Sequence, residues 1–591
     1  ENIHSAIQKL KNVKYDGLLK TNEAIYDLIT LGTSLEQTIE GDTKSHTLNF
    51  IDWRNPERNV FHVTAEFSVE RNRSTETARP DIVLFVNGIP LVVIECKAPN
   101  IDVDQGVSQN IRNQTEEYIP KLFTYAQLLL AVNKNEAKYA TVGSIAKYWA
   151  KWREEGLEEG SDTFEQLNTL INTPIVSDVR TEIEQSVECR IPDSTEPRLV
   201  TEQDKVIYSL LRPERLLELV WKFTIFDGGT KKVARYQQYQ VIKSTLDRIS
   251  KRKPDGSREG GVVWHTQGSG KSLSMVMLAR NLALDTQFTD PRIVLVSDRD
   301  DLDKQLGNTF TSCHLEPQRA TSGRNLLELI ATRSSSIITT IINKFESAYS
   351  ASKYQDNSPD IFLLVDEGHR TQFGSFAARM RQMFPRACYL GFTGTPLMKK
   401  EKNNFAKFGS LIQPYYSITQ AVEDGAVVPL LYEARHVEMT QNQKALDLWF
   451  ERHTKDLTEE QRADLKRKYA RAEMLNKADQ VIYTRAFDIS EHFRANWQNT
   501  GFKAQLVAPN KVSALKYLTY LEELGVVSAA VVMSPPDMRE GYEETEQDES
   551  NDEVVKFWQK MMKRYGKESE YNKQLINQFK HGTDPEILIV I

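Results

Sequence analysis

Eight consecutive residues near the middle of the chain could bind the phosphates of a nucleotide. The segment His265-Thr266-Gln267-Gly268-Ser269-Gly270-Lys271-Ser272 follows the apolar run 261–264 and precedes a helical stretch, 273–284. Glycines there allow successive backbone N–H groups to wrap a phosphate at the positive end of a helix dipole. Lys271 would reach the β- and γ-phosphates, and the Ser272 hydroxyl would bind Mg²⁺. The strict pattern has glycine in place of His265, but the strand before and the helix after favour an ATP site over a chance match.

Two carboxylates could complete this site from another part of the chain. Asp366 and Glu367 directly follow the apolar run 361–365. They therefore lie at the carboxyl end of a predicted buried strand, where ligands bind in open α/β sheets. Asp366 would hold Mg²⁺ through water, and Glu367 would polarise the attacking water. An Asp-Glu pair by itself is usually a solvated strand end, but beside a phosphate-binding loop it indicates ATP hydrolysis.

Two shorter segments fit the same reaction. In Arg235-Tyr236-Gln237-Gln238, the Gln238 amide can offer both a donor and an acceptor to adenine. A glutamine on a polar helix is, however, more often simply exposed. The residues Thr393, Gly394 and Thr395 end another apolar run, and their small size and hydroxyl groups suit them to coupling the nucleotide state to DNA contacts.

A predicted hairpin in the first hundred residues indicates a second kind of chemistry. Asn87-Gly88 separates two apolar runs, 82–86 and 91–94, which is a strong hairpin signal. Folding this hairpin places Asp81 across from residues 94–96, near Glu95, and strand alternation puts Glu95 and Lys97 on one face. Two carboxylates that hold Mg²⁺, with an ammonium that offsets phosphate charge, suit phosphodiester hydrolysis. The alternative is a charged hairpin end that is merely solvated.

Apolar runs that alternate with helical stretches predict the elements that position these residues. Short runs typical of parallel strands buried on both faces occur at 262–264, 293–296, 337–341, 361–365 and 387–392. This alternation predicts an α/β fold with a doubly wound parallel sheet. Strands are also predicted near 60–69 and at 504–507, 529–533 and 587–591, and helices over 105–155. The acidic stretch 539–553 is predicted to be a solvated, mobile insertion.

Composition limits the class of protein. The chain has 591 residues, 40% of them hydrophobic and 27% charged, which predicts several soluble domains. Its four cysteines show no CxxC spacing, so neither a zinc site nor a disulfide framework is indicated. No apolar run approaches the roughly 20 residues that span a bilayer, so we expect no membrane partner and a cytoplasmic location. The net charge of −7 gives no general basic surface, and DNA contacts would be local or shared with partners.

Residues 230–430 resemble superfamily 2 helicases and translocases in the order and spacing of their motifs. Arg235 to Gln238 stand in motif Q, the phosphate-binding loop is motif I, and Asp366-Glu367-Gly368-His369 is motif II. The resemblance implies that His369 belongs to the ATP site and that Thr393 to Thr395 form motif III. It also implies that Asp298 and Arg299, in the place of motif Ia, contact the DNA backbone.

The hairpin resembles the PD-(D/E)xK nucleases, with Asp81, Glu95 and Lys97 as the matching residues. Gln114 and Tyr118 match the Q-x-x-x-Y element of RecB-like nucleases, which we expect on a helix because residues four apart share a face. The resemblance implies that both residues belong to the nuclease site.

A nuclease followed by a superfamily 2 motor resembles the R subunit of type I restriction enzymes. The resemblance implies a restriction-endonuclease-like nuclease domain at 1–180, a linker at 181–204, a first RecA-like lobe at 205–430 and a second at 431–591. Motifs V and VI of that family do not occur in this sequence. We therefore expect the second lobe to be incomplete and ATP turnover by this chain alone to be poor.

The same resemblance implies a bacterial or archaeal enzyme that uses ATP and Mg²⁺ to translocate double-stranded DNA and to cleave it away from the recognition site. The implied partners are a methyltransferase subunit and a specificity subunit, which read the sequence. Two alternatives stay open. One is a free-standing helicase-nuclease for repair or phage defence, and the other is a DNA-binding scaffold without nuclease activity.

Overall fold

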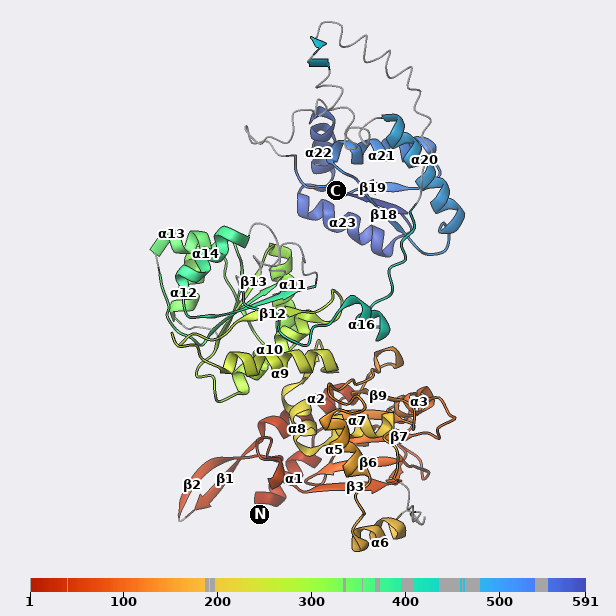
Figure 1. Cartoon of the computed structure of the whole chain (residues 1–591), viewed down its shortest axis with the longest axis vertical. Coiled ribbons are helices and arrows are strands. Elements are labelled where there is room, and N and C mark those ends of the chain that lie inside the picture. Colours follow the sequence, from red (N-terminus) through yellow and green to blue (C-terminus); the bar gives the residue numbers. More distant parts are fainter. Residues whose placement is uncertain are drawn as a thin grey trace. The chain divides into compact units, whose positions relative to one another are not determined.

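The structure of the chain, a computed structural model, describes residues 2–39, 41–186, 191, 197–332, 336–352, 354–366, 373–394, 408–434, 458–459, 461–462, 479–536 and 551–591. It divides into two compact units, Glu1–Pro429 and Leu430–Ile591. Figure 1 traces the chain through both. The residues predicted to act in the nuclease and ATP sites all belong to the first unit.

A five-stranded mixed sheet forms the centre of the N-terminal region (Figure 1). Its order is β3-β6-β7-β8-β9, with β7 and β8 parallel and the other neighbours antiparallel. The strands are β3 Phe61–Ala65, β6 Ile82–Val86, β7 Ile89–Cys96, β8 Leu128–Val132 and β9 Ala137–Ala140. Asn87 and Gly88 have φ angles of 50° and 81°, which a tight two-residue turn requires. The predicted hairpin is confirmed.

The predicted helical stretch over 105–155 is wrong for much of its length. Helices α3 Val103–Asn113 and α4 Pro120–Phe123 are present, but β8 and β9 follow them. Every residue of β8 is buried and apolar. Such a run lacks the alternation that distinguishes a strand from a helix. Its pairing with the distant strand β7 decides the conformation.

Short helices and hairpins surround this sheet and lead to the next one. They are α1 Asn2–Lys11, α2 Leu18–Leu31, β1 Thr33–Ile39, β2 Asp42–Leu48, η1 Pro56–Arg58, β4 Val69–Glu70, β5 Thr77–Ala78, η2 Ala146–Tyr148, α5 Asp162–Ile171, α6 Ser177–Ser186, α7 Glu202–Leu211, α8 Pro213–Lys222, β10 Thr224–Asp227 and β11 Thr230–Val233. Helices α6 and α7 occupy the two ends of the segment predicted as a linker, 181–204.

The second large sheet of this unit is parallel and has six strands in the order β12-β17-β16-β13-β15-β14. Its strands are β12 Gly261–Trp264, β13 Arg292–Ser297, β14 Gln318–Arg319, β15 Ile337–Ile341, β16 Ile361–Asp366 and β17 Cys388–Thr393. Its helices are α9 Tyr236–Ser250, α10 Lys271–Leu284, α11 Asp300–Ser312, α12 Gly323–Thr332, α13 Lys344–Ser352, α14 Phe373–Met383 and α16 Ile418–Glu423. The five strands predicted here are confirmed, and the fold is a RecA-like lobe.

The second unit contains a smaller parallel sheet in the order β18-β20-β19. Its elements are α20 Asp479–Asn496, β18 Ala504–Val507, α21 Lys511–Leu524, β19 Ala529–Val531, α22 Asn551–Tyr565, α23 Glu568–His581 and β20 Ile587–Val590. The three predicted strands are confirmed in this second lobe. Most of the acidic stretch, up to residue 550, lies outside the described residues. Among the helices that the structure describes, none has the length and apolar character to cross a bilayer.

Candidate nuclease and nucleotide-binding sites

The hairpin β6–β7 brings Asp81 and Glu95 face to face. Ile82, the first residue of β6, pairs with Ile94 of β7. The preceding residue, Asp81, therefore lies opposite Glu95. The backbone N–H of Cys96 donates a hydrogen bond of 2.6 Å to Asp81 Oδ2, which fixes the orientation of this carboxylate. The predicted pairing of the two carboxylates follows from this register.

The Lys97 ammonium lies beside the same carboxylate. Lys97 Nζ is 3.8 Å from Asp81 Oδ2, and it donates to Gln109 Oε1 of α3 at 2.8 Å. It also donates to the Cys96 carbonyl oxygen at 3.1 Å. These contacts hold the Lys97 side chain near the carboxylates, so Asp81, Glu95 and Lys97 lie together as predicted.

Glu95 is fully buried, with 0% of its surface exposed. The Asn113 amide donates to Glu95 Oε1 at 3.0 Å, whereas Glu95 Oε2 is buried and has no hydrogen-bond partner within the described part of the chain. Burial, and next the charge of the neighbouring Asp81, raise the pKa of Glu95 to about 8. An ionised carboxylate in this place requires a cation as its missing partner.

These features fit a magnesium ion held by Asp81 and Glu95. No cluster of three or more histidine, cysteine, aspartate or glutamate side chains that could hold a metal occurs among the described residues. Mg²⁺ commonly takes one or two protein carboxylates and completes its octahedron with water and substrate phosphates, so the opposed pair of Asp81 and Glu95 fits this ion. The orphaned oxygen of Glu95 makes this pair the candidate metal site.

The expectation that Gln114 and Tyr118 share a helical face is wrong. Helix α3 ends at Asn113, Gln114 is its C-cap, and the following residues form turns before Pro120. Gln114 accepts from the Gly143 N–H at 2.8 Å and donates to a carbonyl of α3, so its amide supports the fold. Pro120 restricts only the residue before it and begins α4, so the end of α3 at Asn113 is set by the Gln114 contacts.

Tyr118 lies between two arginines. The guanidinium groups of Arg71 and Arg112 are 4.4 and 4.9 Å from the centre of its ring. Within the described residues, the contacts given above for Gln114 and Tyr118 involve neither Asp81 nor Glu95, and the assignment of both residues to the nuclease stays a prediction.

Helix α3 contributes two residues that sequence reasoning missed, Gln109 and Asn113. They lie four residues apart and contact Lys97 and Glu95. Gly106 lies one turn earlier on this helix, where an added Cβ would be 3.2 Å from the Ala131 side chain. Gly106, Gln109 and Asn113 are three and four residues apart, so they share one face of the helix. This spacing in the sequence could have indicated that these residues face the site.

The phosphate-binding loop joins β12 to α10 as predicted. Gly268 and Gly270 have φ angles of 84° and 90°, a conformation that only glycine adopts without strain. Lys271 begins α10, and its Nζ lies 2.7 Å from Asp366 Oδ1 at the end of β16. Ser272 is the second residue of the same helix. The structure thus places Lys271 and Asp366 in direct contact, although they are far apart in sequence.

Three further loop residues, Thr266, Gln267 and Ser269, contact neighbouring segments or each other. Thr266 Oγ1 donates to the Tyr416 carbonyl at 2.8 Å, and Ser269 Oγ donates to the Thr266 carbonyl at 2.6 Å. A Cβ on Gly394 would be 3.1 Å from the Gln267 nitrogen. Gly394 therefore allows the end of β17 to approach the loop closely.

His265 occupies the position where the strict phosphate-loop pattern has its first glycine. Its side chain is fully buried and lies 6.1 Å from the Tyr416 ring, and its backbone N–H donates to the Thr393 carbonyl. Burial lowers the pKa of His265 to about 4, so the imidazole is neutral at pH 7. The histidine is accommodated because its side chain packs into the core of the lobe.

Gln238 contacts the loop as well. Its Oε1 accepts from the Arg235 N–H at 2.9 Å, which caps α9, and its Nε2 donates to the Gly270 carbonyl at 3.1 Å. Arg235 itself points elsewhere, since its guanidinium donates to the Tyr148 carbonyl at 3.1 Å. Gln238 therefore lies at the loop, as a residue that contacts adenine would, while Arg235 contacts the N-terminal region.

The remaining predicted residues lie at strand ends or outside the described part. Asp298 and Arg299 follow β13, and Arg299 is largely exposed. Thr393 is the last residue of β17 and is buried. Glu367, His369 and Thr395 lie outside the described residues, so their predicted roles are not tested.

Two family models match the chain in the order that the motifs predict. The model described as the type I restriction enzyme R protein N terminus matches residues 1–145. The model described as SWI2/SNF2 ATPase matches residues 237–463. The chain is related to the R subunits of type I restriction enzymes. The relationship that the motifs predicted is confirmed.

Curated relatives extend this relationship over most of the sequence. The HindI endonuclease subunit of a type I restriction enzyme from Haemophilus influenzae is 29% identical over 86% of this chain and 47% of its own length. A Methanocaldococcus jannaschii protein assigned as the MjaIXP endonuclease subunit is 30% identical over 86% of this chain and 48% of its own length. The chain thus spans about half the length of these R-subunit relatives.

Among solved structures, the Hef helicase domain of Pyrococcus furiosus is similar over 60% of this chain and 85% of its own, with 12% identity and a TM-score of 0.35. The RecA-like assignment depends on the strand order described above.

Proposed function

We propose that this chain is the nuclease and motor part of a type I restriction enzyme. It would use ATP to translocate double-stranded DNA and would cleave the DNA away from the recognition site. A methyltransferase subunit and a specificity subunit would supply sequence recognition. The family matches support a restriction subunit with an ATPase region, and the paired carboxylates of the first region support the nuclease.

One observation carries the nuclease assignment: the buried, partly unsatisfied carboxylate of Glu95 opposite Asp81. Burying an unpaired polar atom costs about 1–3 kcal/mol, so a buried carboxylate oxygen without a hydrogen bond beside a second carboxylate favours binding of a cation. The second oxygen of Glu95 lacks such a bond within the described residues. We infer that the buried Glu95 carboxylate lowers the stability of the fold and that its function is to bind a cation.

Each residue of the nuclease site has a separate role in this proposal. Asp81 and Glu95 would hold Mg²⁺, which when bound supplies positive charge to the attacking and leaving oxygens. Lys97 would orient the attacking water and offset the charge of the phosphate. Gln109 and Asn113 would keep Lys97 and Glu95 in place through the hydrogen bonds described above.

The nucleotide site would use the contact between Lys271 and Asp366. The Lys271 ammonium lies 2.7 Å from Asp366 Oδ1. A β- or γ-phosphate would attract Lys271 more strongly, because it carries more charge, and would free Asp366 Oδ1 for Mg²⁺. Glu367 would then polarise the water that attacks the γ-phosphate.

Replacement of Lys271 tests the nucleotide site. Lys271→Ala should weaken the binding of a fluorescent ADP analogue by the whole chain at least tenfold, because the loop loses its only charged phosphate ligand. Lys253→Ala removes an exposed lysine from the loop before β12 and serves as the control, with unchanged binding expected. Equal affinity of wild type and Lys271→Ala would show that the loop does not bind nucleotide.

Replacement of Asp81 tests the nuclease in the assembled restriction complex. Asp81→Asn keeps an oxygen for the Cys96 N–H but removes the charge that a cation requires. We expect DNA cleavage to fall at least a hundredfold while ATP hydrolysis stays within twofold of wild type. Cleavage at the wild-type rate would mean that the hairpin is not the catalytic centre.

A further inference from the structure

A pocket of about 660 Å³ opens between the N-terminal region and the first RecA-like lobe, away from both candidate sites. The loop before η1 forms one wall, and α8, α9 and the end of α10 form the others. Its lining includes two tryptophans, Trp53 and Trp221, and several cationic side chains. Neither the nuclease chemistry nor ATP binding uses these residues.

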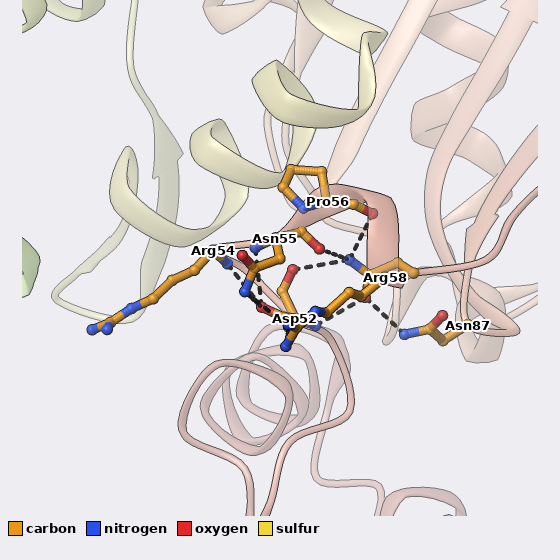
Figure 2. Close-up of polar contacts among 7 residues, drawn as sticks. Asp52, Arg54, Asn55, Pro56, Arg58 and Asn87 are labelled. Carbon is orange, nitrogen blue, oxygen red and sulfur yellow. Dashed lines mark hydrogen bonds and ion pairs between the residues drawn. The ribbon is translucent and has the colours of Figure 1, made fainter.

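Hydrogen bonds link the residues of the loop that forms the first wall (Figure 2). Asp52 Oδ1 accepts hydrogen bonds from the backbone N–H groups of Arg54 and Asn55 at 3.2 and 3.0 Å, and Asn59 donates to the Asp52 carbonyl at 2.9 Å. Slight burial opposes ionisation, but the hydrogen bonds from Asn55 and Arg54 lower the pKa of Asp52. Figure 2 shows the Arg54 side chain directed away from this network. The loop thus presents Trp53 and Arg54 in a prearranged geometry.

Aromatic and cationic groups meet in this pocket. The rings of Trp53 and Trp221 are 6.4 Å apart and nearly parallel, at 21°. The Arg54 guanidinium lies 6.0 Å from the Trp221 ring and the Lys222 ammonium 5.4 Å from it. Trp53 Nε1 is already bound to the Ile29 carbonyl at 3.1 Å, so its indole is fixed. Flat rings beside cations are the combination that binds a base and its phosphate.

The charges of the lining leave several cations available. Five cationic and three acidic side chains line the pocket, an excess of two positive charges in a chain of net charge −7. Lys243 is paired with Glu218 at 2.7 Å and Arg215 with Glu154 at 2.8 Å.

The other three cations, Arg54, Arg212 and Lys222, form no ion pair within the described residues. Arg212 Nε is in addition buried without a hydrogen-bond partner in the part of the chain that the structure describes. Arg212 lies 4.1 Å from the Tyr208 ring, and Lys222 helps to lower the pKa of Glu218. Neither contact is an ion pair, so these three cations beside aromatic rings favour an anionic ligand. Two unpaired acidic residues, Glu214 and Asp285, also line the pocket within the described part of the chain.

We propose that this pocket binds one or two nucleotides of a single DNA strand, with a base against Trp221 and phosphates on Arg54, Arg212 and Lys222. A duplex keeps its bases stacked, so it could use the cations but not the tryptophan. The volume is in the range of pockets that hold small organic ligands, roughly 300–1,000 Å³, and limits occupancy to a short segment. The inference depends on the proposed function only in taking DNA as the nucleic acid.

Binding of a labelled twelve-nucleotide oligothymidylate to the whole chain tests this site. Saturating ADP keeps the nucleotide loop filled, and fluorescence anisotropy reports binding. We expect Arg54→Glu and Trp221→Ala each to weaken binding at least tenfold. Lys253→Glu makes the same type of charge reversal at an exposed residue before β12, at the other end of the sheet from the phosphate-binding loop, and should change binding less than twofold. Arg54 is exposed, so its variant should keep the wild-type Tm.

Two outcomes would overturn the assignment. One is that Arg54→Glu binds the strand as tightly as Lys253→Glu. The other is that thymidine monophosphate competes as well as the oligonucleotide, which would identify a free nucleotide as the ligand. Photocrosslinking with a bromodeoxyuridine strand should label peptides that contain Trp53 or Trp221, and labelling confined to other peptides would also contradict the proposal. Failure here would leave ADP binding and its loss in Lys271→Ala intact, so it is distinguishable from failure of the proposed function.

Discussion

The buried carboxylate of Glu95 makes the stability of the protein depend on pH. Its pKa is raised to about 8, so the folded chain holds a proton that the unfolded chain releases above its ordinary value near 4.5. The contribution of Glu95 to the free energy of unfolding is fully present below that ordinary pKa. It is lost as the pH rises through about 8. The buried site therefore opposes folding most strongly at alkaline pH when no cation is present.

Glu95→Gln should remove this dependence. We compare the free energy of unfolding of the variant with that of wild type in EDTA. The variant's advantage over wild type should be larger at pH 8 than at pH 5, by at least about 1 kcal/mol. Mg²⁺ should raise the Tm of wild type at pH 8 but not that of the variant, because only the ionised carboxylate binds the ion. Parallel stability curves for both proteins would contradict the raised pKa, and an equal effect of Mg²⁺ on both would contradict the metal site.

At the scale of elements, the phosphate-binding loop depends on a close approach between two segments. Gly270 has a φ of 90°, and a Cβ there would lie 2.8 Å from Gln238 Nε2. The carbonyl of the same residue accepts the Gln238 hydrogen bond. Helix α9 and the start of α10 are thus joined at the residue that must stay small.

Gly270→Ala should weaken ADP binding at least tenfold, because the left-handed backbone becomes strained by about 1–2 kcal/mol and Gln238 is displaced. Gly256→Ala is a matched control, since Gly256 has a φ of 80° and nothing within 4 Å of the added Cβ. Its Tm should fall because alanine is strained in this left-handed backbone conformation, but it should bind ADP like wild type. Equal ADP affinities of the two variants would mean that the Gln238 contact is irrelevant to the loop.

At the scale of the molecule, one buried lysine ties the N-terminal region to the hairpin β10–β11. Lys231 is 2% exposed, and its ammonium donates to Asn22 Oδ1 at 2.7 Å and to Gln127 Oε1. Asn22 in turn donates to the carbonyls of Phe123, Thr124 and Ala126. Burial lowers the pKa of Lys231 well below its usual value. Folding therefore releases a proton here, and this group stabilises the unit more as the pH rises toward 10.5.

Lys231→Met should destabilise the first unit by about 1–3 kcal/mol at pH 7, because two buried acceptors lose their donor. The difference in unfolding free energy between wild type and variant should grow between pH 7 and 9.5. As the pH rises, less free energy is needed to remove the proton from Lys231 on folding, and the variant has no such proton. Chemical denaturation of both proteins at each pH measures this. A difference that does not change with pH would show that the lysine stays charged in the folded protein.

The local signals in the sequence were sufficient for much of the architecture. The apolar runs of the first RecA-like lobe are near-continuous and are bounded by turns, so their strands could be predicted within a residue or two. Asn87-Gly88 likewise determines the hairpin, because both residues accept a positive φ. The phosphate-binding loop and the opposed pair Asp81 and Glu95 follow from these local features, which need no knowledge of distant contacts.

Only the tertiary structure decided what depends on residues far apart in the chain. The run 128–132 is a strand because it pairs with β7, and Gln114 leaves the helix because its amide is taken by Gly143. The burial of Glu95 under Asn113, the contact of Lys271 with Asp366 and the insertion of Lys231 beside Asn22 could not be read from spacing. Periodicity reports which face of an element is apolar, whereas burial and partners are set by the packing of elements against one another.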